Sequence, residues 1–259
     1  GEGEGEGEGE GAAVVRGLLA DEIEIDETVA ANSQIGAQTQ ARVACDVDGA
    51  QCVVVWRDDR SEGGGAGDIF GGVVDVNADA APVVFPVTLA DGEQSEPDVC
   101  FTGGVFLVVW DDERDPSHNQ VFGATIAVDA SRNANVSGEA LVANDAKKPS
   151  LSSVIDDVAT FDARVVFQQT DNGNLRVARL TSPQLSQPAG ADVADIGVSS
   201  SIRAAVTAKS DETAVLWVDP TSDVKLSRAF TTPAAGDVTV ESAVDVERLS
   251  LAPSGAGGF

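Results

Sequence analysis

The chain has 259 residues, and its hydrophobic content of 42% argues against wholesale disorder. Its formal net charge of −27 repels phosphate backbones and therefore disfavours nucleic acid as a partner. No stretch approaches the roughly 18 apolar residues of a membrane helix, and the Val-rich runs punctuated by Gly and Pro indicate an all-β protein.

The chain begins with alternating glycine and glutamate over residues 1–11. In an extended strand every Glu would lie on one face and every Gly on the other, so this arm could add as a strand to a neighbouring molecule. A linker or tag is the alternative. We expect a low-complexity arm (1–11), a single repeat domain (12–252) and a flexible tail (253–259). The candidate interaction residues of the arm are Gly1, Glu2, Glu4, Glu6, Glu8 and Glu10.

Internal repetition is the main signal in the rest of the chain. Residues 41–76 and 97–128 align well, and weaker versions follow over 149–180 and 203–230. The repeats are anchored by aromatic residues at intervals of about 50 to 57 residues. These anchors are Trp56, Trp110, Phe167 and Trp217.

Each repeat is predicted to contain four strands. The apolar runs 53–56, 107–110 and 215–217 are continuous, which predicts strands buried on both faces, as in stacked blades. The fold expected is an all-β, β-propeller-like one, with about four four-stranded repeats of roughly 50 residues. Residues 14–30 and 246–252 could form a fifth blade shared by the termini; a four-bladed ring or an open stack is the alternative.

The repeat pattern also carries a family resemblance. Val-Val-Val-Trp-Arg-Asp-Asp-Arg over 53–60, followed by Asp-Ile-Phe-Gly over 68–71, is similar to repeats of secreted bacterial proteins of β-propeller type. Residues 149–180 and 203–230 depart from it, because the Asp-x-Arg and Phe-Gly elements are absent there. The resemblance implies a scaffold or binding module and no reaction.

The turn after each of the first two tryptophans gathers acidic residues. Asp58, Asp59, Asp111 and Asp112 are candidate calcium ligands, although neither turn has the spacing of a calcium hand. The alternative is a structural latch, in which Asp accepts backbone N–H groups and Arg pairs with a carboxylate of the next repeat.

Three cysteines suggest an oxidising compartment. If Asp48-Gly49 is a two-residue hairpin turn, Cys45 faces Cys52, and a disulfide between them is possible. This count places the pair at a hydrogen-bonded site, where the Cβ atoms are further apart. A bridge from Cys45 to Cys100, at a corresponding place in the second repeat, is the competitor. Gly103-Gly104 is expected to form the equivalent turn there.

No catalytic constellation stands out. The single histidine, His118, excludes multi-histidine zinc sites, and no Gly-rich phosphate loop opens a helix. We therefore expect a non-enzymatic, extracellular structural or interaction module of a cell-surface or filamentous assembly. Its partner is expected to be another protein or a second copy. No cofactor is expected, with calcium as the alternative. A calcium- or glycan-binding propeller is the second hypothesis, and a glycoside hydrolase or lyase of propeller type is the third.

Overall fold

The structure is a computed structural model of the chain. It describes residues 37–60, 66–78, 80–154, 160–183, 185, 187–188, 193–199, 203–209, 212–229, 238–241 and 249–251. The glycine–glutamate arm, the C-terminal tail and almost all of the expected fifth blade lie outside these residues. The described part contains no helix, and hence no helix that could cross a membrane.

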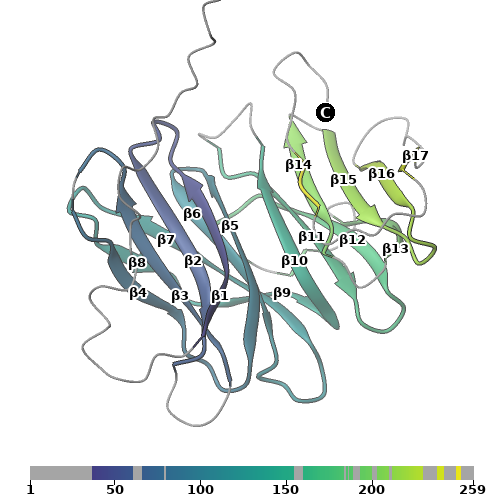
Figure 1. The fold of residues 1–259 in the computed structure, drawn as a ribbon, viewed down its shortest axis with the longest axis horizontal. Coiled ribbons are helices and arrows are strands. Elements are labelled where there is room, and N and C mark those ends of the chain that lie inside the picture. Colours follow the sequence, from purple (N-terminus) through teal and green to yellow (C-terminus); the bar gives the residue numbers. More distant parts are fainter. Residues whose placement is uncertain are drawn as a thin grey trace, which may run out of the picture.

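Four antiparallel sheets, which we call blades 1 to 4, follow one another in chain order (Figure 1). Blade 1 contains β1 (Gln38–Cys45), β2 (Gln51–Asp58), β3 (Asp68–Asp75) and β4 (Val83–Thr88). Blade 2 contains β5 (Gln94–Thr102), β6 (Val105–Asp112), β7 (Gln120–Val128), β8 (Ala134–Val136) and β9 (Ala140–Asn144). Blade 3 contains β10 (Ala146–Ser153), β11 (Ala163–Gln169), β12 (Asn174–Leu180) and β13 (Val193–Val198). Blade 4 contains β14 (Ala205–Lys209), β15 (Glu212–Val218), β16 (Val224–Ala229) and β17 (Val238–Glu241).

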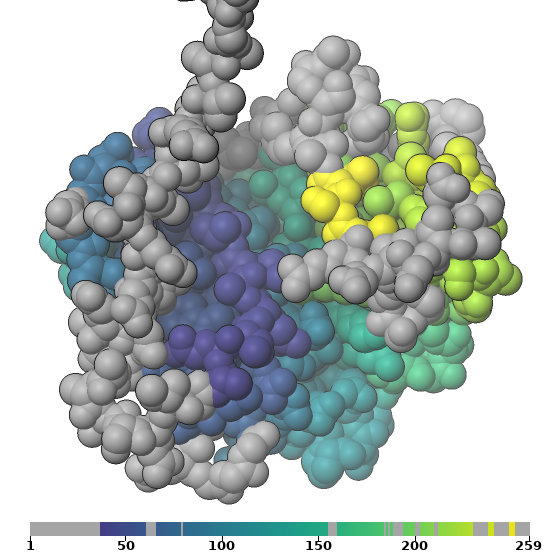
Figure 2. All heavy atoms as spheres, in the orientation of Figure 1, coloured from purple at the N-terminus to yellow at the C-terminus, as the bar shows by residue number. Residues whose placement is uncertain are grey.

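Within each blade, every strand pairs with the next one along the chain, except that β8 and β9 both pair with β7 at the outer edge of blade 2. The all-β, propeller-like fold of four repeats predicted from the sequence is therefore confirmed. The first strands β1, β5, β10 and β14 contact one another in that order, so they are the inner strands. Figure 2 shows blade 1, in purple and blue, and blade 4, in green and yellow, on one face of the molecule.

The core consists of three apolar clusters, one between each pair of successive blades. Most of the continuous apolar runs is buried: Val53, Val55, Val108 and Val215 are fully buried, whereas Val54 and Leu216 are half-buried. Strand β1 differs, because Val43 is 61% exposed whereas the corresponding Val99 of β5 is 6% exposed. In the described part of the chain, the inner strand of blade 1 therefore has a neighbouring blade on one side only.

The inner hairpins of blades 1 and 2 use different turns. In blade 2, Gly103 and Gly104 form the expected two-residue turn, both with positive φ, between the paired residues Thr102 and Val105. A Cβ on Gly103 would lie 2.7 Å from the Cβ of Phe161 in blade 3. Glycine is therefore required at this position both for its positive φ and for lack of space.

In blade 1 the expectation of a two-residue turn at Asp48-Gly49 is wrong. The Asp46 N–H donates to the Gln51 carbonyl (2.9 Å), so the loop has four residues, and the Gly49 N–H closes it on the Asp46 carbonyl. Cys45 and Cys52 consequently fall at a non-hydrogen-bonded site, where opposing strands approach closely. Their Cα atoms are 3.9 Å apart, and a disulfide joins them.

Cys100 is a buried free thiol. It pairs with Leu107 and therefore corresponds to Ala44, which pairs with Val53, rather than to Cys45. Successive residues of a strand point to opposite faces, so the alternative bridge from Cys45 to Cys100 is not formed. Burial raises the pKa of the Cys100 thiol far above its usual value, and the nearby Asp98 raises it further.

Candidate functional site

The calcium candidates in blades 1 and 2 lie at the end of the second strand. Asp58 is fully buried, and its carboxylate accepts hydrogen bonds from the Trp56 indole (3.1 Å) and from the Arg60 backbone N–H (2.9 Å) and Nε (2.7 Å). Burial acts to raise the pKa of Asp58, but the hydrogen bonds from Arg60 and Trp56 outweigh it and lower the pKa.

Blade 2 repeats this corner. Asp112 is fully buried and binds the Trp110 indole (2.9 Å) and the Arg114 guanidinium, which lies 3.9 Å from the centre of the Phe122 ring. Arg60 and Arg114 each pair with the carboxylate of their own turn, and Arg114 also pairs with Glu139 of the same blade, whereas the latch hypothesis supposed a carboxylate of the next repeat. Arg57 makes the contact toward blade 2 instead, with Glu93 at 3.3 Å.

The four candidate carboxylates do not converge on one point. Asp59 pairs with Arg57, and Asp111 accepts a hydrogen bond from the Lys148 N–H of blade 3 (2.6 Å). Among the described residues, no group of three or more His, Cys, Asp or Glu side chains is arranged to hold a metal ion. Calcium binding at these positions remains a prediction.

A feature that the sequence analysis missed lies near the start of the inner strands. β1, β5 and β10 each carry a bulge at the same register position, between Thr39 and Arg42, Ser95 and Asp98, and Lys147 and Ser150. The bulged residues Gln40, Glu96 and Lys148 have φ values of 60°, 51° and 56°. Positive φ is costly for residues with a side chain, and such strain clusters at functional sites.

We call the polar group around these bulges the channel mouth; it comprises Gln40, Glu96, Asp98, Asp111, Lys148 and Arg203. Gln40 and Glu96 exchange hydrogen bonds between blades 1 and 2, the Glu96 N–H donating at 2.7 Å. Asp98 accepts from the Leu151 N–H of blade 3 (2.7 Å). Arg203, just before β14, lies 3.5 Å from both the Glu96 and the Asp98 carboxylate.

The carboxyl groups of the mouth have unequal environments. Asp111 is 8% exposed, and burial raises its pKa to about 8, with the charge of Glu96 adding to the effect and the Lys148 N–H opposing it. The Glu96 side chain is 30% exposed and lies beside the Arg203 guanidinium. The buried Asp111 carboxyl group therefore holds its proton more tightly than an exposed carboxyl group would, and Glu96 lies close enough for its charge to act on it.

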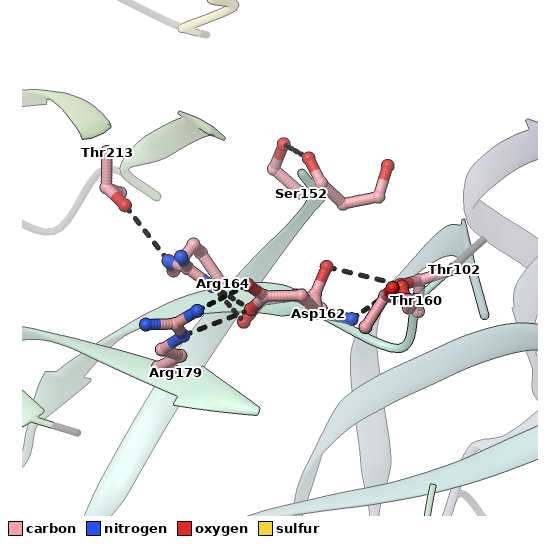
Figure 3. Close-up of polar contacts among 9 residues, drawn as sticks. Thr102, Ser152, Thr160, Asp162, Arg164, Arg179 and Thr213 are labelled. Carbon is pink, nitrogen blue, oxygen red and sulfur yellow. Dashed lines mark hydrogen bonds and ion pairs between the residues drawn. The ribbon is translucent and has the colours of Figure 1, made fainter. Parts of the chain in front are cut away.

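The opposite ends of the inner strands carry a second polar cluster (Figure 3). The Asp162 carboxylate pairs with the fully buried Arg164 and with Arg179 (2.7 Å), and Arg164 Nε donates to the Thr213 hydroxyl of blade 4 (3.1 Å). The Asp162 N–H donates to the Thr102 hydroxyl of blade 2 (3.0 Å). This cluster ties three blades together, so it explains packing rather than chemistry.

A pocket of about 400 Å³ opens near the same end. It lies between the inner strands, and its lining includes Val99, Phe101, Leu151, Ser153 and Thr207. The expected interaction arm lies outside the described residues, and the lone histidine, His118, sits in an exposed turn 3.1 Å from Asp115.

No protein-family model matches the chain, and no curated protein matches it. Among solved structures, a GH43_1 enzyme from Xanthomonas citri is similar, with 11% identity, a TM-score of 0.51, and coverage of 81% of this chain and 75% of that one. Its complex with xylotriose gives 10% identity, a TM-score of 0.50, and coverage of 81% and 74%. The Hadza microbial sialidase Hz136 gives 8% identity, a TM-score of 0.57, and coverage of 81% of this chain but 46% of the sialidase.

These comparisons contradict the main functional expectation. A non-enzymatic module for a cell-surface or filamentous assembly was expected, but the similar folds belong to a GH43 glycoside hydrolase and a sialidase. With 43 acidic residues in the chain, the sequence does not tell which carboxyl groups lie together, and the mouth gathers Glu96, Asp98 and Asp111 from two strands. At identities of 8–11% the likeness shows the fold alone.

Proposed function

We propose that the chain is a glycan-processing hydrolase whose site is the channel mouth. The observation that carries this proposal is that a buried carboxyl group with a raised pKa, Asp111, lies near a more exposed one, Glu96, which sits on a strained bulge between blades. Glycoside hydrolysis uses two carboxyl groups, one protonated to release the leaving group and one ionised to activate water or to attack. The likeness to enzymes that act on glycans supports this reading.

The roles follow from the two environments. Asp111 has its pKa raised to about 8 by burial, so it can act as the proton donor at neutral pH. Glu96, more exposed and held by Gln40 and Arg203, supplies the carboxylate. The left-handed backbone at Glu96 fixes this carboxylate relative to the inner strands before substrate arrives.

We further propose that the protein acts outside the cell. The Cys45–Cys52 disulfide supports this location, because such bonds persist in oxidising compartments.

The test is hydrolysis of a panel of aryl glycosides and polymeric glycans by the full chain, measured as released aryl alcohol or reducing ends. We expect Asp111→Asn and Glu96→Gln each to lower kcat at least about a hundredfold, because each removes one half of the acid–base pair. Asp195→Asn is the matched control, since Asp195 lies in the outer strand of blade 3, paired with Arg176. The proposal fails if the folded chain hydrolyses nothing in the panel, or if the mouth variants turn over substrate as fast as Asp195→Asn.

A further inference from the structure

The pocket of about 400 Å³ between the inner strands, which we call the channel pocket, has the size and the walls of a ligand site. Ligand pockets in proteins measure roughly 300–1,000 Å³. All four inner strands contribute to its wall, with Ala44 from β1, Val99 and Phe101 from β5, Leu151 from β10 and Val206 from β14. Each of these strands is paired within its own blade, so the wall is in place before a ligand arrives.

The channel pocket is lined mainly by apolar side chains, and its polar groups are neutral or already paired. Ser153 and Thr207 contribute hydroxyl groups. Among the described residues, Asp46 supplies the only carboxylate of the lining, and no lysine, arginine or histidine lines the pocket. The Asp46 carboxylate already accepts a hydrogen bond from the Ala50 N–H of its own loop (2.9 Å). An anionic ligand would therefore lose its hydration without gaining a counter-charge, and a cationic one would have to share a carboxylate that is already bound.

The rim of the channel pocket is also apolar. Val47, in the inner hairpin loop of blade 1, lines the pocket and is nevertheless 62% exposed. Phe101 and Leu251 line it as well and are half-buried. Apolar side chains left open beside a cavity are typical of binding sites, and a bound apolar ligand would remove their surface from water.

The channel pocket is separate from the channel mouth. None of the six mouth residues is among its lining residues. Along β5 the mouth residues Glu96 and Asp98 come before the pocket residues Val99 and Phe101, and the strand then continues to the end of the channel opposite the mouth. The pocket therefore has a chemistry of its own, which the carboxyl groups of the mouth do not explain.

We propose that the channel pocket binds an uncharged, largely apolar small molecule that carries a hydroxyl group, an aromatic alcohol being the simplest member of this class. The apolar part packs against Val99, Leu151 and Val206. The hydroxyl group of the ligand exchanges a hydrogen bond with that of Ser153 or Thr207, which fixes its orientation. Because this site uses none of the mouth residues, it does not depend on whether the chain hydrolyses glycans.

The experiment is titration calorimetry of the full chain with three probes that share one ring system: 1-naphthol, 1-naphthoate and 1-naphthylmethylammonium. We expect 1-naphthol to bind at least about tenfold tighter than either charged probe, because the one carboxylate of the described lining is already hydrogen-bonded. The proposal is overturned if the folded chain binds no 1-naphthol, or if a charged probe binds as tightly.

Two pocket variants locate the binding, each with a matched control. Ser153→Phe fills the pocket and should weaken 1-naphthol binding at least about tenfold, whereas Ser131→Phe, the same change at an exposed turn of blade 2, should not. Val47→Asp places a carboxylate at the rim and should weaken binding at least about fivefold, whereas Val76→Asp, at a valine 55% exposed and outside the pocket, should not. Both valines are exposed, so this second pair decides the matter if Ser153→Phe does not fold.

A mouth variant separates the two sites. Glu96→Gln should leave 1-naphthol binding unchanged. Unchanged binding in a folded pocket variant, or a loss of binding in Glu96→Gln, would place the ligand elsewhere and overturn the proposal. Binding of 1-naphthol by a chain that hydrolyses nothing would refute the hydrolase and leave this site standing; hydrolysis by a chain that binds no 1-naphthol would do the reverse.

Discussion

The corners of blades 1 and 2 differ from those of blades 3 and 4 in one connected set of contacts. In the first two blades a Trp indole donates to a buried Asp, an Arg pairs with that Asp, and a Phe pairs across the strands with the Trp. In blade 3 a phenylalanine, Phe167, replaces the Trp, and the residue facing it is Arg176. Blade 4 keeps Trp217, which faces Lys225.

In blade 4, where the Phe and the Arg are absent, the carboxylate takes different partners. Asp219, which stands where Asp112 stands in blade 2, binds its own turn through the Thr221 and Asp223 N–H groups and lies 3.5 Å from Lys225. Trp217 Nε1 consequently has no acceptor in the described part of the chain. The comparison teaches that Trp, Asp, Arg and Phe form one unit, so losing the Phe and Arg removes the reason for the Asp to face inward.

The largest effect is expected from removing the central carboxylate of the unit. Asp112→Ala leaves the Trp110 N–H and part of the Arg114 charge buried without an acceptor, so the free energy of unfolding should fall by about 3 kcal/mol. Urea denaturation measures it. Asp219→Ala should cost clearly less, because that carboxylate serves a half-buried turn; equal losses would show that the two corners are equivalent.

Blades 1 and 2 also differ at the residue directly after the Trp. In blade 1 this residue is Arg57, which contacts Glu93, and in blade 2 it is Asp111, which is buried. The pKa of Asp111 is raised to about 8, so the folded state binds a proton that the unfolded state has released above about pH 4. Stability should therefore fall between about pH 5 and 8, by up to about 1.4 kcal/mol per pH unit. Denaturation midpoints across this range should lose that slope in Asp111→Asn and keep it in Asp195→Asn.

The two inner hairpins give a smaller contrast. The four-residue loop of blade 1 is closed by the Cys45–Cys52 disulfide, whereas blade 2 uses two glycines. Replacing both cysteines by serine should lower the free energy of unfolding by about 2 kcal/mol, because a short closed loop constrains the unfolded chain only modestly. Reductant should lower the melting temperature of the wild type to about that of the double variant and leave the double variant unchanged. A shift in both proteins would refute this assignment.

The smallest effect sharpens the comparison most. Trp110→Phe removes a donor from a buried carboxylate and should cost about 1–2 kcal/mol, whereas Trp217→Phe removes an N–H that has no acceptor among the described residues. Both substitutions also remove part of a buried indole's volume, so Trp217→Phe should cost about 1 kcal/mol less than Trp110→Phe. Thermal or urea denaturation of the two variants, measured side by side, gives the two losses in the free energy of unfolding. A larger loss at Trp217 would mean that its N–H is satisfied in solution.

The sequence by itself determined the repeat, the strands and the buried anchors. The Val-rich runs beside Trp56 and Trp110 can be buried only between stacked sheets, because a strand that is apolar on both faces must be covered on both. The glycine pair at 103–104 likewise determined its turn, since both positions need positive φ.

Only the tertiary structure decided the site. Glu96, Lys148 and Arg203 are far apart in sequence, and nothing local marks them, since their meeting depends on how the inner strands of blades 2, 3 and 4 lie beside one another. The same holds for Asp111, which the sequence marks only as a calcium candidate, because the burial that raises its pKa comes from the assembled blades. A glycine turn is local and can be predicted from the chain, whereas the loop length in blade 1 and the three bulges were not. Desolvation and the approach of charges between blades are properties of the assembled fold.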